Sequence, residues 1–122
     1  MAHYAQDTRL VAEPVINPAV VMQRIGCDTR LLREIAALFL AGCPTRMAEL
    51  RAALARRDRE TLERTAHSLK GSMSNFAATR AVHAAARLEY LAHAGDLTAA
   101  TDACAVLERE VACVTDALVA LC

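Results

Sequence analysis

Residues 100–121 read ATDACAVLEREVACVTDALVAL, and this stretch decides the fold. Its apolar residues recur at alternating intervals of three and four, the spacing that lines side chains along one face of a long helix. A seam sustained over this length is typical of an antiparallel helical bundle. The seam consists of Ala100, Cys104, Leu107, Val111, Val114, Leu118 and Leu121.

Helical spacing also predicts four earlier segments: residues 19–25, a long stretch after Asp28, residues 59–75 and residues 80–94. The predicted starts carry side chains that can accept hydrogen bonds from free helical N–H groups. These caps are Asn17, Asp28, Asp58 and Asp96. The long stretch is interrupted at Pro44, so it is either one kinked helix or two helices meeting there. Its expected inward face is Leu31, Leu32, Ile35, Leu38 and Phe39.

Composition supports a helical chain and restricts its function. Gly and Pro number only 4 and 3, and no strand pattern is present, so the fold class is all-α. We expect one bundle over residues 17–122, preceded by a tail or linker over residues 1–16. The 14 basic and 14 acidic residues give zero net charge. This balance argues against nucleic-acid binding, which needs a basic face to neutralise phosphates.

The chain shows no sign of a membrane or secretory role. No segment reaches the roughly 20 apolar residues that span a bilayer, and the N-terminus lacks a secretory pattern. The five cysteines are odd in number and include no CxxC pair. We interpret them as reduced thiols of a cytoplasmic protein, with Cys104 on the seam serving core packing.

A helical wheel of residues 59–75 places one histidine outside the bundle. A narrow apolar stripe marks the buried side of this helix: Leu62, Ala66, Leu69, Met73 and Phe76. His67, Gly71 and Ser74 fall on the opposite side, and Lys70 lies between that side and the edge of the stripe. His67 is therefore predicted to face water or a partner.

An exposed imidazole suits nucleophilic phosphoryl transfer because it is largely neutral near pH 7 and keeps a free lone pair. Lys70, one turn away and the only lysine in the chain, could stabilise negative charge on a transferring group. Gly71 is costly inside a helix by about 1 kcal/mol relative to alanine, which favours a role in clearance for a partner. Ser68 and Ser74 could bind a phosphoryl group or a partner, or could equally be ordinary polar surface.

The run Ala66-His67-Ser68-Leu69-Lys70-Gly71-Ser72 resembles the signature of the histidine-containing phosphotransfer family of two-component phosphorelays. The resemblance extends over roughly residues 17–118. The flanks that carry it are Leu31-Leu32-Arg33-Glu34, Leu38-Phe39-Leu40, Pro44, Leu50-Arg51-Ala52-Ala53-Leu54 with Asp58, Leu88-Glu89 and Ala94-Gly95-Asp96.

The resemblance implies an up-and-down antiparallel four-helix bundle with an additional short N-terminal helix. It also implies a carrier, not an enzyme in its own right, whose phospho-acceptor is His67 and whose phosphoryl-stabilising cation is Lys70. The resemblance assigns the clearance position to Gly71. Apart from the resemblance, we regard Ser68, Ser74 and Arg64 as further candidates for docking. The family usually has Gly at position 77, so Ala77 is expected to make the joint after Phe76 more helical.

The implied partners are response-regulator receiver domains and a hybrid sensor histidine kinase. We expect this chain to be a monomer. The phosphoryl group would arrive from a receiver aspartyl phosphate and leave to a second receiver. No cofactor or metal is expected on this chain, because the receiver would hold the Mg²⁺. The sequence leaves the donor kinase, target regulator and pathway open, and does not distinguish a free-standing protein from a domain of a longer one.

Three alternative functions differ in the chemistry that they require. A chemotaxis-type kinase domain would use the same chemistry with a different donor. A helical interaction module would use no phosphorylation. A carboxylate-bridged metal site needs Glu-x-x-His pairs on two helices, and neither His83 nor His93 has such a partner in the sequence.

Overall fold

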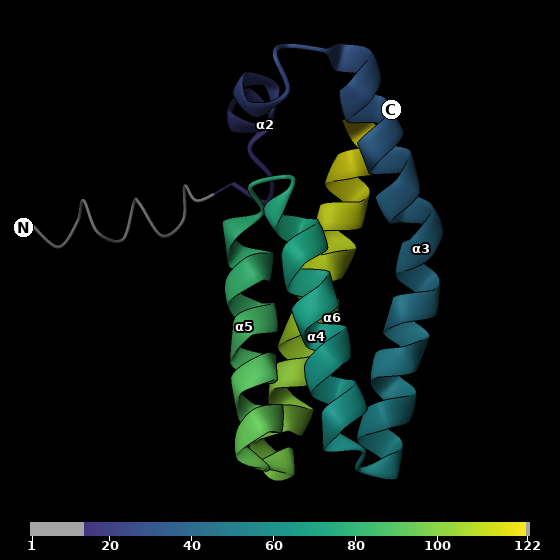
Figure 1. Cartoon of the computed structure of the whole chain (residues 1–122), viewed down its shortest axis with the longest axis vertical. Coiled ribbons are helices and arrows are strands. Elements are labelled where there is room, and N and C mark those ends of the chain that lie inside the picture. Colours follow the sequence, from purple (N-terminus) through teal and green to yellow (C-terminus); the bar gives the residue numbers. More distant parts are fainter. Residues whose placement is uncertain (1–13, 122) are drawn as a thin grey trace, which may run out of the picture.

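The computed structural model describes residues 14–121 and is all-helical over that range. Its helices are α2 (Pro18–Arg24), α3 (Thr29–Arg56), α4 (Arg59–Ser74), α5 (Thr79–Ala94) and α6 (Leu97–Leu121) (Figure 1). The predicted fold class is thus confirmed. Most of the expected tail over residues 1–16, together with His3 and Cys122, lies outside the described residues. None of the helices within residues 14–121 is long and apolar enough to cross a membrane.

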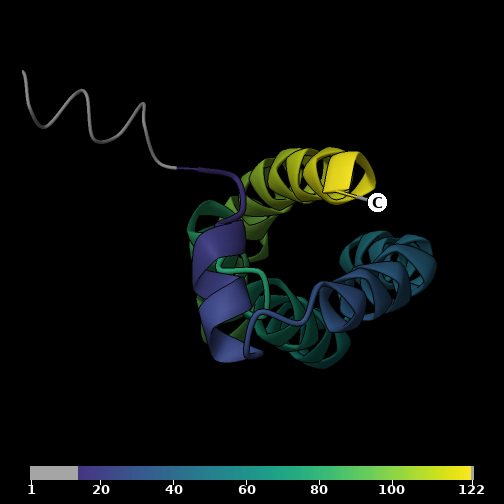
Figure 2. The same cartoon turned by 90° about the horizontal axis from the view of Figure 1, so that it is seen from above.

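The four long helices form the bundle, and α2 lies across one end of it. Each long helix packs against the next one in sequence, and α6 returns to contact α3. Seen along the bundle, α3 and α6 form the two ends of an arc, with α4 and α5 between them (Figure 2). The histidine helix α4 therefore has a neighbour on each side, α3 and α5.

The predicted caps at these helix starts are confirmed. The side chain of Asn17 accepts a hydrogen bond from the N–H of Val20 at 3.3 Å. Asp28 and Asp96 accept from the N–H groups three residues further on, each at 3.0 Å. Because these acceptors satisfy free N–H groups of the first turn, the helices begin close to where the sequence predicts.

The structure has a single helix α3 that continues through Pro44. Of the two alternatives that the sequence leaves open, two helices meeting at Pro44 are therefore excluded. The predicted inward face of this helix is partly wrong. Leu32 and Phe39 are buried, but Leu31 is exposed and Leu38 is 75% exposed. Periodicity identifies an apolar stripe, yet it does not tell the centre of the stripe from its rim.

The core is built from small aliphatic side chains with few aromatics. The seam of α6 is buried as predicted from Ala100 to Leu118, whereas Leu121 is exposed at the end of the helix. Burial raises the pKa of the Cys43 and Cys104 thiols above the usual range, so both stay protonated. The four cysteines in the described part of the chain are free thiols.

The joint between α4 and α5 is a tight turn that is hydrogen-bonded to α2 and its N-cap. Ala77 has a φ of +50°, in the left-handed region, so the expectation of a more helical joint is wrong. Arg24 donates a hydrogen bond to the carbonyl of Ser74, and the N–H of Asn17 donates to the carbonyl of Phe76, both at 3.0 Å. The turn must reverse the chain within a few residues, and this requirement overrides the helical preference of alanine.

The strained position makes a prediction about stability. Ala77→Gly should raise the free energy of unfolding by about 1 kcal/mol, because glycine adopts the left-handed conformation without the clash of a Cβ atom. Ala52→Gly, at an exposed position inside α3, should lower it by about 1 kcal/mol. Urea unfolding of the two variants checks this, and equal destabilisation by both would contradict it.

Candidate functional site

The buried stripe of α4 turns His67 outward. Leu62, Ala66, Leu69 and Met73 are completely buried, and their common side is packed into the core. The His67 side chain, on the opposite side, is 66% exposed. The predicted outward orientation of this ring is confirmed.

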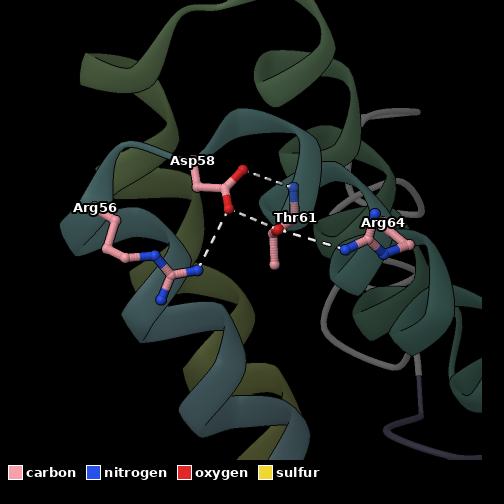
Figure 3. A network of polar contacts seen from close by, with 4 residues as sticks. All are labelled: Arg56, Asp58, Thr61 and Arg64. Carbon is pink, nitrogen blue, oxygen red and sulfur yellow. Dashed lines mark hydrogen bonds and ion pairs between the residues drawn. The ribbon is translucent and has the colours of Figure 1, made fainter.

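The start of α4 is fixed by a polar network around Asp58 (Figure 3). One carboxylate oxygen of Asp58 accepts from the N–H of Thr61 at 3.2 Å, and the other accepts from the Thr61 hydroxyl at 2.7 Å. The same carboxylate pairs with Arg56 at 3.3 Å. The hydroxyl bond first, and then the backbone bond, lower the pKa of Asp58. The Asp58 carboxylate thus stays ionised. As the N-cap, it fixes the residue at which α4, the helix that carries His67, begins.

Glu89 of α5 contacts both His67 and Lys70. Its Oε2 atom lies 2.7 Å from Nδ1 of His67, and its Oε1 atom lies 2.6 Å from Nζ of Lys70. The sequence reasoning used Glu89 only as a match in the flanks and did not place it in the site. A signal was available, because His67 and Glu89 are equally far along the chain from Ala78 in two antiparallel helices.

The charge of Glu89 determines which nitrogen of His67 is free. The hydrogen bond from Lys70 is the main cause of a lowered Glu89 pKa; burial opposes it, and His67 lowers it further. An ionised carboxylate only accepts hydrogen bonds. A neutral His67 must then carry its proton on Nδ1, which donates to Glu89. The lone pair is left on Nε2.

The predicted residues divide into two groups around His67. Lys70 lies toward α5, and its side chain is 32% exposed. Gly71 is exposed, and a Cβ atom added there would meet nothing within 4 Å. Ser68 and Arg64 line a small depression on the side toward α3.

Ser74 continues the line of His67 and Gly71 toward the end of α4. Its side chain is exposed, and its carbonyl accepts the hydrogen bond from Arg24.

A second carboxylate–histidine pair lies beside the first. Nδ1 of His93 on α5 is 3.1 Å from Oε2 of Glu63 on α4. His93 is exposed, and its acidic partner on α4 is not evident from spacing within one helix. Among residues 14–121, no three His, Cys, Asp or Glu side chains lie close enough together to hold a metal ion.

The Glu89 contact makes a prediction that spectroscopy can check. In the unaltered chain, ¹⁵N spectra of the neutral imidazole, recorded at alkaline pH, should show His67 protonated on Nδ1. Glu89→Gln should give a mixture of the two neutral forms, because a carboxamide can both donate and accept. Glu63→Gln is the matched control and should leave the ring of His67 unchanged. Protonation on Nε2 in the unaltered chain would contradict this geometry.

Comparison with protein families identifies a single domain. A family model for the Hpt domain matches residues 34–117, which is more than half of the 122 residues. Comparison with curated proteins and with solved structures gave no match. The matched range contains α4 and α5 with the whole His67, Lys70 and Glu89 cluster. The chain belongs to the Hpt domain family, whose members carry phosphoryl groups on histidine in phosphorelays.

Proposed function

We propose that this chain accepts a phosphoryl group on Nε2 of His67 from the aspartyl phosphate of one receiver domain and passes it to an aspartate of another. The observation that carries the proposal is the contact of Nδ1 with Glu89 at 2.7 Å. It leaves the nucleophilic nitrogen unprotonated and exposed.

The transfer step balances with the groups present. The Nε2 lone pair attacks phosphorus, the bond from phosphorus to the aspartate oxygen breaks, and the aspartate leaves as a carboxylate. The ring then carries a positive charge shared with its Nδ1–H group. Glu89, which already accepts from that group, stabilises this charge. Transfer onward is the same step in reverse.

Lys70 supplies the second electrostatic contribution. Its ammonium rests on Glu89, one helical turn from His67, and can turn to a phosphoryl oxygen when that group arrives. The partner receiver supplies the aspartate and the Mg²⁺ ion, so this chain needs no cofactor for its part. It acts as a carrier and not as an enzyme with turnover of its own, and we expect a cytoplasmic monomer.

Replacing His67 tests the proposal directly. Incubation with a phosphorylated receiver should place an acid-labile, base-stable label on the unaltered chain, and His67→Gln should abolish it. His93→Gln is the matched control, since His93 is also exposed and also paired with a carboxylate, and it should keep the label. Folding of both variants is checked by circular dichroism. Label remaining on His67→Gln would refute the proposal.

Gly71 gives a second test. Gly71→Leu should raise the receiver concentration for half-maximal transfer by about tenfold, equivalent to about 1.4 kcal/mol. The physical reason is that an added side chain occupies space a partner needs, while helix stability should rise by up to about 1 kcal/mol. Ala105→Leu adds an exposed leucine on α6 and should leave transfer unchanged. Equal transfer by Gly71→Leu and the unaltered chain would remove the clearance role.

A further inference from the structure

The two carboxylate–histidine pairs result from one register between α4 and α5. Glu63 and His67 are four residues apart on α4, and the same spacing separates Glu89 from His93 on α5. Residues at this spacing share one face of a helix. Because the helices are antiparallel, each carboxylate meets the histidine of the other helix, at 2.7 Å for His67 and at 3.1 Å for His93. The two histidines therefore lie on the same exposed surface of the bundle.

His93 has the same hydrogen-bonding geometry as His67. Its side chain is 75% exposed, and the ring atom that faces Glu63 is Nδ1. An ionised carboxylate only accepts hydrogen bonds, so a neutral His93 donates from Nδ1 and keeps its lone pair on Nε2. An exposed ring nitrogen with a free lone pair is the nucleophile that phosphoryl transfer to histidine requires.

Arg59 brings a positive charge to this second pair. It precedes Glu63 by one turn on α4. Its guanidinium lies over Gly95, which follows His93 by two residues: a Cβ atom added to Gly95 would be 2.6 Å from Nη1 of Arg59. Within the part of the chain that the structure describes, Arg59 forms no ion pair. Its guanidinium can therefore turn to a phosphoryl oxygen carried by His93.

A third histidine of the described residues lacks this arrangement. His83 of α5 is exposed, but it has no hydrogen-bond or ionic partner among residues 14–121. Its proton can occupy either ring nitrogen, so the lone pair is divided between two atoms. His83 thus shows what exposure alone provides, without a carboxylate on Nδ1 and without a neighbouring cation.

We propose that His93 is a second phosphoryl acceptor, which takes the group on Nε2 from small donors with a good leaving group, such as phosphoramidate. The Nε2 lone pair attacks phosphorus, the phosphorus–nitrogen bond of phosphoramidate breaks, and ammonia leaves. The ring then carries a positive charge shared with its Nδ1–H group. Glu63 accepts from that group and stabilises the charge. The inference concerns a site separate from that of the proposed function.

A receiver domain is not the donor for His93, because the neighbours proposed to support that reaction are missing there. Helix α4 continues past His67, with Lys70 and the open position Gly71 in the next turn. Helix α5 ends one residue after His93. The residue three positions beyond His93 is Asp96, an acidic side chain engaged in capping α6. A small donor needs neither clearance nor docking, so an exposed Nε2 is sufficient.

Phosphoramidate labelling of three single-histidine chains tests the inference. The chains retain His67, His93 or His83, with every other histidine replaced by glutamine, and circular dichroism checks that each is folded. The measurement is the rate at which an acid-labile, base-stable label forms. The His93 chain should be labelled more slowly than the His67 chain, since its Nδ1 contact is longer, but at least about fivefold faster than the His83 chain. Equal rates for the His93 and His83 chains would overturn the inference.

Two substitutions in the His93 chain separate the roles of its neighbours. Glu63→Gln should lower the labelling rate about fivefold, and ¹⁵N spectra should show His93 as a mixture of the two neutral forms. Arg59→Gln should lower the rate about twofold, with a smaller effect at high salt. Glu60→Gln, at an exposed position of the same helix, is the matched control and should change neither the rate nor the spectrum. An unchanged rate in Glu63→Gln would contradict the proposed role of this carboxylate.

A purified phosphorylated receiver distinguishes the two sites. It should label the His67 chain and leave the His93 chain unlabelled. Absence of phosphoramidate label from the His93 chain, with receiver label on the His67 chain intact, would overturn the inference while the proposed function stands. Receiver label on the His93 chain would overturn both the restriction to small donors and the assignment of the relay to His67 alone.

Discussion

One-sided burial of α4 is the constraint on which the site depends. Leu62, Ala66, Leu69 and Met73 are packed without any exposure, so rotating the helix to hide His67 would bring these side chains into water. Burying the larger of these side chains, Leu62, Leu69 and Met73, is worth about 1.5–3 kcal/mol each, far more than an exposed imidazole could gain by entering the core. The orientation of His67 is thus a consequence of core packing, and no separate interaction is needed to hold the ring outside.

Antiparallel pairing of α4 and α5 supplies the second constraint. The tight turn at Ala77 fixes which residues of the two helices lie opposite one another. It brings Glu89 to His67 and His93 to Glu63. The carboxylate that orients the imidazole therefore comes from a different helix, while the nearby cation Lys70 comes from the same one. A change in the length of the joint would separate Glu89 from both groups and leave the histidine exposed but unoriented.

Sequence periodicity and caps were enough to predict the helices, because both act within a few residues along the chain. The wheel also placed His67, Lys70 and Gly71 correctly relative to the core. The contact with Glu89 was not predicted, since it depends on the register between two helices and not on spacing within one. The exposure of Leu38 has a related cause. Helical spacing groups Leu38 with Phe39 on one apolar face, and only the packing of α3 against α4 shows which part of that face is covered. The left-handed conformation of Ala77 cannot be predicted from residue preference, because it depends on the geometry of the turn.

The short helix α2 has a consequence for where an independently stable unit can begin. The Hpt match starts at residue 34, yet carbonyl groups at the end of the histidine helix bond to Arg24 and Asn17. A shortened chain beginning at the matched boundary would leave those oxygens to water, so fraying would start two turns from the imidazole. The smallest piece that keeps its reactive ring on a rigid support is therefore longer than the region shared with the family.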